Sequence, residues 1–493
     1  MASLAASPSS AHATAPRFAS LRLSLSKSAR LALWVAGIII ALNLYAPAEP
    51  SLLVRVLGSA IILVSAFAVW LWTVGYDRYT AFVPLMAVIY SIHFALPVFV
   101  FMAYIFQLGG EVVSEVYVER ALALALAGLI CTLAGYYLVA LTTLRDHLPK
   151  FKMQWRPQGG LELWAYPLGG LGLAVYLFTQ VVEISVSSRR FTDLAGELCV
   201  LAILMLFFLQ LAGRLSWVGK LYLWGILLPL RTLLSLGTGL LGQAAPPVLA
   251  LLLAYTTVRR KIPWAALAAG LLAFGVLHPF KNSFRSLAWH GGAASNRSLS
   301  QKAGLYFELG ETFWQAPPPP QLVLGFTMLR LSHITEFADV VRETPANVPY
   351  WNGKTYYSLP FKPIPRFLWK DKPKEDTSQR FGHRYNFIPL ENYETAWNLP
   401  QLTEFYANFG LSGVIAGMFV VGLIYGCLQA CLIHRESGIG AVIGAAYLLA
   451  GLLLIEVNSS NLLGQVFDEA LVLAALNPLM RMRWDVAPAA DLP

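Results

Sequence analysis

The sequence predicts an all-α polytopic membrane protein with about 12 transmembrane helices and one large loop between the ninth and tenth spans. Hydrophobic residues make up 57% of the 493 residues and charged residues only 13%, whereas about 25% of the residues of a soluble protein are charged. Most apolar residues fall in runs that approach the roughly 20 residues a helix needs to cross a bilayer. One long polar and aromatic segment, 280–406, interrupts these runs.

The apolar runs give the positions of the spans. We place them near 31–47, 53–74, 81–106, 121–143, 161–182, 194–213, 217–236, 243–258, 263–279, 409–433, 439–457 and 463–480. Arg231 lies within the seventh span, and Gly and Pro residues separate that span from the eighth. A break or re-entrant turn is therefore expected there, enclosed by protein or water.

These spans divide the chain into five parts. A basic tail without acidic residues (1–30), expected to be disordered, precedes a transmembrane bundle (31–279), the polar loop (280–406), a C-terminal group of membrane helices (407–480) and a short tail (481–493). Basic residues follow the fourth, eighth, tenth and last spans, and acidic or neutral linkers alternate with them. The positive-inside rule then predicts a bacterial inner (plasma) membrane protein with both termini in the cytoplasm and the polar loop in the periplasm.

Composition excludes several kinds of function. The net charge is +9, but the cations flank apolar spans, so nucleic acid is not an expected partner. No GxxxxGK[ST], HExxH or CxxC motif occurs, so neither a nucleotide, a metal nor another cofactor is expected. The four cysteines all lie in apolar runs, where they are expected to pack. A substrate used on the outer face must then arrive activated, as a lipid-linked sugar does.

Two parts of the loop carry cations next to the membrane. The segment His278–Ser286, which includes Arg285, can either anchor the chain at the interface or contact lipid phosphate. The apolar pattern from Gln321 to Arg342 predicts one helix, on which Arg330 and His333 share a face. An Arg suits a phosphate and a His suits proton transfer. The alternative is an amphipathic helix with both side chains solvated.

Aromatic and basic residues alternate between Arg342 and Asp376. The aromatic side chains could lie against sugar rings or form an interfacial belt; they are Tyr350, Trp351, Tyr356, Tyr357 and Trp369. The cations suit a pyrophosphate or an acidic glycan; they are Lys354, Lys362, Arg366, Lys370, Lys372 and Lys374. The acids Asp371, Glu375 and Asp376 lack the spacing of a cation-binding loop, so a solvated turn is favoured over a metal site.

The loop ends in TEFYANFG (Thr403–Gly410), which leads into the tenth span. A carboxylate at the mouth of a membrane helix can act as a general base for a sugar hydroxyl. Glu404 is therefore the first candidate for the base, followed by His333 and His383. The alternative role of Glu404 is an ordinary acid at a helix start, which complements the helix dipole.

Three motifs together resemble the Wzy-type polymerases of O-antigen and exopolysaccharide repeat units. They are PYWNGKTY (Pro349–Tyr356), PIPRFLWKDKP (Pro363–Pro373) and TEFYANFGLSGVIAGM (Thr403–Met418). The spacing from Arg342 to Gly353 also matches one discussed for that family. The sequence departs from the family at LSLGTGLLGQ (Leu234–Gln243), where a GSR-like turn is common; Arg231 would substitute one helical turn earlier.

The resemblance implies a metal-independent, inverting glycosyl transfer between two undecaprenyl-pyrophosphate-linked oligosaccharides, in contact with membrane lipids and alongside a chain-length regulator and a flippase. Glu404, His333 and Arg366 would be catalytic. The substrate would be bound by Arg330, Arg342, Gly353, Lys354, Tyr350, Trp351, Tyr356, Trp369, Lys372, Arg285 and Arg231. Two alternatives remain: an O-antigen-ligase-type transferase with a different acceptor, and a polysaccharide or lipid-sugar transporter or flippase without enzymatic activity.

Overall fold

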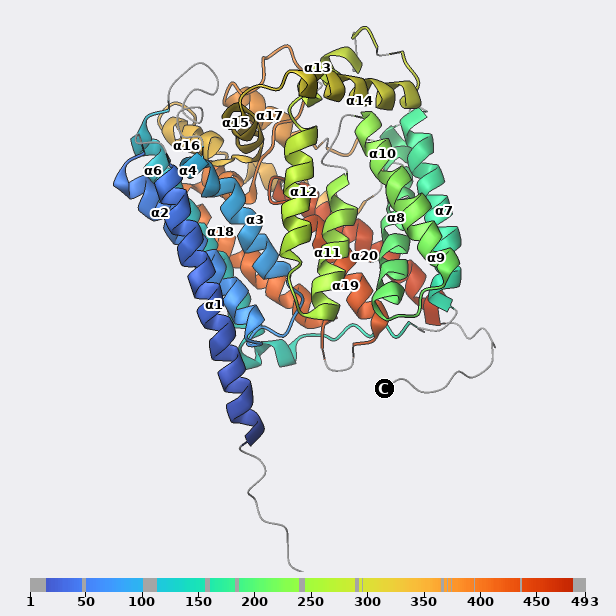
Figure 1. The fold of residues 1–493 in the computed structure, drawn as a ribbon. Coiled ribbons are helices and arrows are strands. Elements are labelled where there is room, and N and C mark those ends of the chain that lie inside the picture. Colours follow the sequence, from blue (N-terminus) through green and yellow to red (C-terminus); the bar gives the residue numbers. More distant parts are fainter. Residues whose placement is uncertain are drawn as a thin grey trace, which may run out of the picture.

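The protein is a bundle of helices with a helical cap at one end (Figure 1). The computed structural model describes residues 15–481 apart from 47–49, 101–112, 156–159, 182–185, 239–243, 289–291, 295, 365–367, 370, 374, 394 and 435–436. The described residues form helices, turns and irregular segments, with no strand among them. The predicted all-α fold class is confirmed at this level.

The bundle consists of apolar helices that run up and down. They are α1 (Ala15–Tyr45), α2 (Leu52–Thr73), α3 (Phe82–Phe94), α4 (Leu96–Val100), α6 (Glu115–Ala140), α7 (Gly160–Val181), α8 (Val186–Leu211), α9 (Trp217–Leu221), the π-helix η3 (Tyr222–Leu227), α10 (Leu228–Thr238), α11 (Ala245–Arg259), α12 (Trp264–Leu277), α18 (Gln401–Leu432), α19 (Ile439–Leu452) and α20 (Ser459–Arg481). A 3₁₀ turn, η2 (Thr143–His147), follows α6.

Seven of the described helices contain a stretch long and apolar enough to cross a membrane: parts or all of α1, α2, α6, α7, α8, α18 and α20. The pair α12 and α13 (Lys281–Ala288) would add an eighth if it were one span bent by 51°. The remaining predicted spans coincide with shorter or interrupted helices, namely α3 with α4, α9 to α10, α11 and α19. The protein therefore has the helices of a multi-pass membrane protein, with about seven that meet the length expected of a full span.

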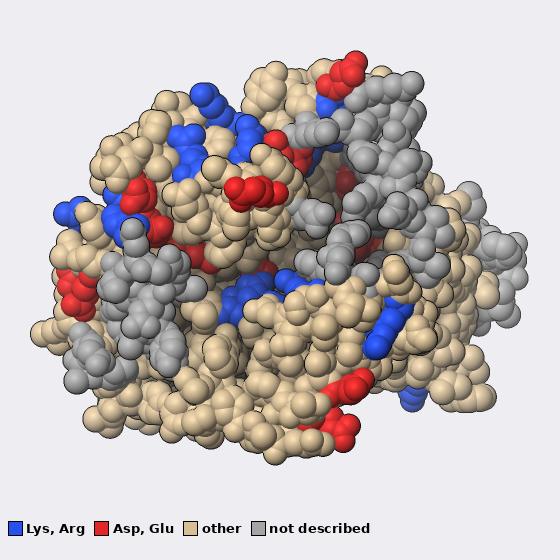
Figure 2. Space-filling model, turned by 90° about the horizontal axis from the view of Figure 1, so that it is seen from above, with Lys and Arg blue, Asp and Glu red and all other residues tan. Residues whose placement is uncertain are grey.

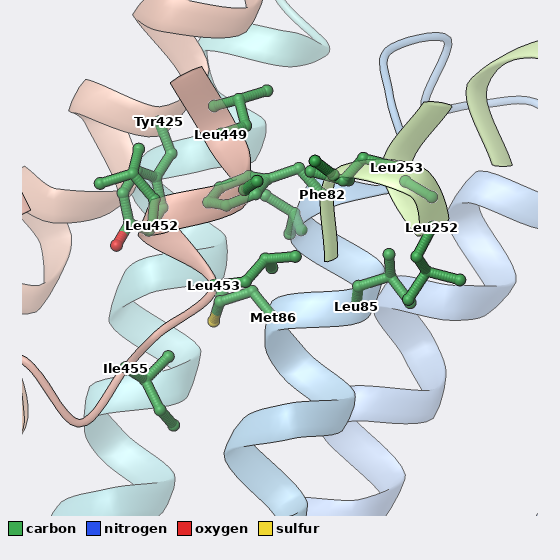
Figure 3. Close-up of a cluster of buried hydrophobic side chains, with 14 of the residues drawn as sticks. Phe82, Leu85, Met86, Leu252, Leu253, Tyr425, Leu449, Leu452, Leu453 and Ile455 are labelled. Carbon is green, nitrogen blue, oxygen red and sulfur yellow. The ribbon is translucent and has the colours of Figure 1, made fainter. Parts of the chain in front are cut away.

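Apolar side chains from distant parts of the chain fill the centre of the bundle (Figure 3). Phe82 of α3 meets the ring of Tyr425 of α18 edge to face, with the ring centroids 4.9 Å apart. Leu253 of α11 and Leu449 of α19 belong to the same buried cluster. The helix α18 packs most extensively against α6, where glycines allow close approach of the two backbones. Gly410 has a non-helical backbone (φ +63°) and divides α18 into two helical parts. Tyr425 of the second part donates to Gln401 Oε1 of the first at 3.2 Å, so this core lies next to the start of α18, from which the polar site is built.

The segment between α12 and α18 folds into a cap across one end of the bundle (Figure 1). Besides α13 it contains α14 (Leu299–Gln315), α15 (Pro320–Leu331), α16 (Ile334–Glu343), the 3₁₀ turns η5 (Lys354–Tyr356) and η6 (Leu359–Phe361), and α17 (Thr377–Arg384). Two small apolar clusters stabilise it, one around Phe284 and Tyr306 and one around Trp351 and Phe381.

The prediction of one helix from Gln321 to Arg342 is wrong, because α15 and α16 are separate. Ser332 adopts an extended conformation. The backbone N–H of His333 donates to the carbonyl oxygen of His93 in α3, at 3.0 Å, rather than continuing the helical hydrogen bonds of α15. A tertiary hydrogen bond therefore breaks the helix, and Arg330 and His333 do not share a helix face.

Candidate functional site

The polar centre of the molecule lies where the cap meets the short connection between α19 and α20. We call residues 456–461 the α19–α20 junction. Its side chains and backbone contact three separate parts of the cap and the start of α18. Figure 2 looks onto the capped end and shows a hollow with Lys and Arg side chains gathered along its edge.

Glu456 of the junction binds two cations. Arg330 of α15 donates to its two carboxylate oxygens through Nη1 and Nη2, at 3.0 and 3.4 Å. Asn398 Nδ2 donates to Oε2 of the same carboxylate at 2.9 Å. His333 Nε2 lies 3.6 Å from that oxygen, which is a charge contact longer than a hydrogen bond. Arg330 and His333 are thus brought together, by a shared carboxylate rather than by helical spacing.

The other ring nitrogen of His333 contacts a second carboxylate. Nδ1 lies 3.1 Å from Glu336 Oε2, and the imidazole stacks on the ring of His93 with a centroid distance of 4.9 Å. Burial alone lowers the pKa of His333, but the carboxylates of Glu336 and Glu456 outweigh burial and raise that pKa to about 9. His333 is therefore a cation at neutral pH.

More cations surround Arg330. Lys281 and Arg285 of α13 both interact with it through repulsion between their positive charges. His278, at the bend between α12 and α13, is buried, and its Nδ1 atom has no hydrogen-bond partner among the described residues. Lys281 is 7% exposed. The Arg330–Glu456 pair therefore lies in a region with an excess of positive charge, which suits an anionic group of a ligand.

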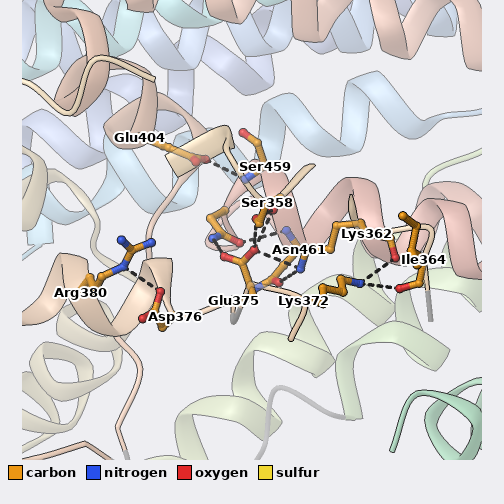
Figure 4. A network of polar contacts seen from close by, with 12 residues as sticks. Ser358, Lys362, Ile364, Lys372, Glu375, Asp376, Arg380, Glu404, Ser459 and Asn461 are labelled. Carbon is orange, nitrogen blue, oxygen red and sulfur yellow. Dashed lines mark hydrogen bonds and ion pairs between the residues drawn. The ribbon is translucent and has the colours of Figure 1, made fainter. Parts of the chain in front are cut away.

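A second network forms around Glu375 (Figure 4). Its Oε2 atom accepts hydrogen bonds from Ser358 and from Ser460 of the junction and lies 3.2 Å from Lys362 Nζ. Lys362 also donates to Asn461 Oδ1 at 2.9 Å. Burial raises the pKa of Glu375, but the hydrogen bond from Ser358 and the charge of Lys362 outweigh it and lower that pKa to about 2. These partners are hydrogen-bond donors or cations, so the carboxylate of Glu375 is ionised. Its role here is structural, since it holds Ser358, Lys362 and Ser460 together.

Glu404, the predicted base, is fully buried at the start of α18. Its Oε2 atom accepts a hydrogen bond of 2.7 Å from the backbone N–H of Ser459 in the junction. Its Oε1 atom has no hydrogen-bond partner within the described part of the chain, and the same holds for the hydroxyls of Thr403, Ser459 and Tyr356. Glu404 thus contacts the same junction as Arg330 and Glu375.

The motifs PYWNGKTY and TEFYANFG pack directly against each other. Asn408 of α18, fully buried, accepts from the backbone N–H of Gly353 at 2.9 Å and donates to Thr355 Oγ1 at 2.8 Å. The N–H groups of Trp351 and Asn352 donate to the carbonyl oxygens of residues 407 and 408. Gly353 has φ +83°, a conformation that a side chain would strain. The two motifs form one structural unit.

Several predicted substrate-binding residues have structural contacts elsewhere. Arg342 is paired with Asp339 and Glu343 on α16. Arg231 lies over the ring of Tyr176, 3.6 Å from its centroid, and donates to Ser235 of its own helix α10. These contacts place neither arginine in the network around the junction.

Other candidates from the cap also have identified partners. Tyr350 OH would lie 2.6 Å from a Cβ atom built on Gly410, and Trp369 packs edge to face on Phe361. Lys372 donates to the carbonyl oxygens of Lys362 and Ile364, and His383 contacts the carbonyl of Asn392. Arg366, Lys370 and Lys374 lie outside the described residues.

Sequence reasoning missed the junction itself. Glu456 was included in a predicted span, 439–457, and the polar run EVNSSN (Glu456–Asn461) between two apolar spans was the signal that could have identified it. Glu336 was also missed, although it lies three residues after His333. Glu456 was missed because its partners Arg330, His333 and Asn398 lie in distant segments of the sequence.

Comparison with known proteins places most of this structure in one family. Residues 175–473, from α7 to α20, match the family model described as "Domain of unknown function (DUF8712)". The chain belongs to this family. No curated protein and no solved structure matches it. The DUF8712 region contains the whole cap and the α19–α20 junction. Of the residues described above in the polar centre, only His93 lies outside this region.

Proposed function

We propose that the protein is a membrane glycosyltransferase that polymerises undecaprenyl-pyrophosphate-linked oligosaccharide repeat units, for O-antigen or exopolysaccharide, at the periplasmic face of a bacterial inner membrane. The observation that carries the proposal is the cluster of Arg330, His333 and Glu456, with Lys281 and Arg285 next to it, at one end of an apolar bundle. Such a position gives a lipid-linked substrate access to cations and carboxylates at the membrane boundary.

The reaction assigns a role to each group. The acceptor hydroxyl attacks the anomeric carbon of the donor, the bond from that carbon to the pyrophosphate breaks, and the configuration inverts. Arg330, Lys281 and Arg285 bind the leaving pyrophosphate, and protonated His333 adds a fourth positive charge. Since His333 already carries its proton at neutral pH, a carboxylate takes the proton of the hydroxyl. Glu404 is the carboxylate we assign to this step, because its Oε1 atom has no hydrogen-bond partner among the described residues, whereas the carboxylate of Glu456 is occupied by Arg330 and Asn398.

The positions of the two chain ends support an even number of spans, as in the proposed topology of about 12. The lower end of α1 and the C-terminal end of α20 lie at the end of the bundle opposite the cap (Figure 1). With both termini in the cytoplasm, the cap is then periplasmic. The shorter or interrupted helices α3, α9 to α10, α11, α12 and α19 would supply the other five spans. A short helix can span where the apolar layer is locally thinner.

Elongation of a lipid-linked oligosaccharide by the purified protein tests this function directly. Arg330→Ala and Arg330→Lys should both reduce the rate at least about 100-fold, because Lys retains the charge but not the two-pronged geometry. Arg297→Ala, in an exposed part of the cap, should leave the rate unchanged. Products that no longer carry the lipid would indicate a ligase-type transferase instead, and elongation that is insensitive to Arg330 would refute the assignment.

One feature favours a different class, a transporter or flippase. Glu469 lies within α20 and is 4% exposed; Gln465 donates to its Oε1 at 2.8 Å, and its Oε2 has no hydrogen-bond partner among the described residues. Carboxylates inside membrane spans often mark ion or proton pathways. In a deletion strain, lipid-linked single units trapped on the cytoplasmic face would support a flippase. Accumulation on the outer face would support the polymerase.

A further inference from the structure

The cap contains an open pocket that the reaction above does not use. It has a volume of about 480 Å³ and is lined by Asn352, Gly353, Lys354, Tyr356, Tyr357 and Arg380. This size lies within the range of roughly 300–1,000 Å³ for small-molecule sites. None of these residues belongs to the cluster around Glu456.

The floor of the pocket is held by hydrogen bonds and ring packing. The turn at Asn352 and Gly353 has two consecutive residues with positive φ, +51° and +83°. Buried Asn408 holds it in place through the backbone N–H of Gly353, at 2.9 Å. The ring of Tyr356 stacks on Phe409 of α18 at an interplanar angle of 14°. A ligand would therefore meet a preformed surface, which reduces the entropic cost of binding.

The pocket offers positive charge and an aromatic face. Lys354 is exposed, and no side-chain partner is found for its ammonium group among the described residues. Arg380 uses Nε to bind Asp376 at 2.7 Å, which leaves its two Nη groups for other contacts. The ring of Tyr357 is 65% exposed. No Asp or Glu is among the lining residues.

We propose that this pocket binds an acidic sugar, a hexuronic acid unit of the glycan, with its carboxylate on Lys354 and Arg380 and its ring face against Tyr357. Aromatic rings match the apolar face of a sugar, and cations match a carboxylate. The inference rests on the proposed function and adds a substrate class to it: the protein acts on an acidic polysaccharide. The pocket then holds the glycan away from the reacting bond and sets specificity.

Binding of defined saccharides to the full-length protein in nanodiscs tests the proposal. The probes are trigalacturonate and a hyaluronan tetrasaccharide, each compared by calorimetry with its carboxyl-reduced form. The acidic form of at least one probe should bind at least about tenfold more tightly than its neutral form. A hydrogen bond to a charged group usually changes the affinity by at least this factor. Equal affinity of the two forms, or no binding of either acidic probe, overturns the proposal.

Two variants tie the binding to the pocket. Lys354→Gln should weaken the acidic probe about tenfold and leave the neutral form unchanged, whereas Tyr357→Ala should weaken both. Lys302→Gln, a lysine on α14, is the matched control and should change neither. Unchanged binding by Lys354→Gln would refute the site.

Inorganic pyrophosphate separates an acidic sugar from a phosphate group. It should not displace the acidic probe from the pocket; competition that Lys354→Gln abolishes would make this a phosphate site and overturn the sugar assignment. Failure here is distinguishable from failure of the polymerase proposal. A protein that elongates lipid-linked glycans but binds no acidic sugar refutes only the pocket, and one that binds acidic sugars without elongation refutes only the polymerase.

Discussion

Arg330 on α15 and Glu456 in the α19–α20 junction are 126 residues apart and form a two-pronged ion pair, with N–O distances of 3.0 and 3.4 Å. Their side chains are 29% and 20% exposed, so the pair is shielded but reaches solvent. His333 and Asn398 contact the same carboxylate. This pair connects the cap to the membrane bundle, and Glu456 sets the positions of Arg330 and His333, two of the four cations that we assign to the pyrophosphate.

Replacing Glu456 by Gln tests that role. The amide keeps the shape of the side chain but removes the charge that holds Arg330 and His333. We expect elongation to fall at least about 100-fold, because cations displaced by as little as 1 Å lose most of their effect. The rate with a lipid-linked oligosaccharide is the measurement. Glu391→Gln, an exposed acid of the cap, is the control and should retain the wild-type rate; a wild-type rate for Glu456→Gln would contradict the assignment.

The charge of His333 predicts a dependence of stability on pH. Its pKa rises from 6.5 to about 9 on folding, so its stabilising contribution is complete below about pH 6.5 and is lost as the pH rises through 9. The contribution is on the order of 3 kcal/mol. The unfolding temperature in detergent should therefore decrease between pH 6.5 and 9.5. His333→Gln should be less stable at pH 6.5 and should show a smaller decrease; an identical decrease in the variant would show that another group is responsible.

The sequence predicted the fold class, because the apolar runs that form α1, α2, α6, α7, α8, α18 and α20 also pass as candidate spans in the structure. Counting spans was harder. The helices α3, α11 and α19 are apolar but shorter than a full span, and hydropathy alone does not show where such a helix ends. The break between α15 and α16 was also invisible, since it depends on the hydrogen bond from His333 to the backbone of His93.

The candidate site was predictable only in its residue types. Arg330 and His333 were selected as a pair on one predicted helix face and Glu404 by itself, and all three contact the α19–α20 junction. What brings them together is Glu456 and Ser459, which are between 55 and 126 residues away in sequence. Charge and spacing within one segment carry no information about such partners. The enzymatic role itself, and the resemblance from which it came, stay predictions.

Asn408 is expected to hold the two motifs together. Its amide makes hydrogen bonds to Gly353, Thr355 and the carbonyl of Glu404, all at 2.8 to 2.9 Å. Asn408→Ala leaves buried donors and acceptors without partners and should lower the free energy of unfolding by about 2–4 kcal/mol. It should also weaken binding of the acidic probes, because the floor of the pocket loosens. Thermal unfolding and calorimetry measure the two effects.

The matched control for this variant is Asn296→Ala, at an exposed position of the cap. It should change neither the unfolding temperature nor binding. If Asn408→Ala were as stable as this control, the hydrogen bonds to Gly353 and Thr355 would not determine the conformation of the turn.

The contact between α6 and α18 provides the most direct test of the bundle. A Cβ atom on Gly422 of α18 would lie 2.0 Å from the carbonyl oxygen of Thr132 in α6. Because the obstacle is backbone, the two helices must move apart to accept even one methyl group. Gly422→Ala should therefore destabilise the protein by about 1–3 kcal/mol, although Ala is the better helix former. Gly270→Ala in α12 makes the same change where no atom lies within 4 Å and should be neutral or slightly stabilising. Unfolding temperatures in detergent compare the two, and equal values would show that α6 and α18 are not this close.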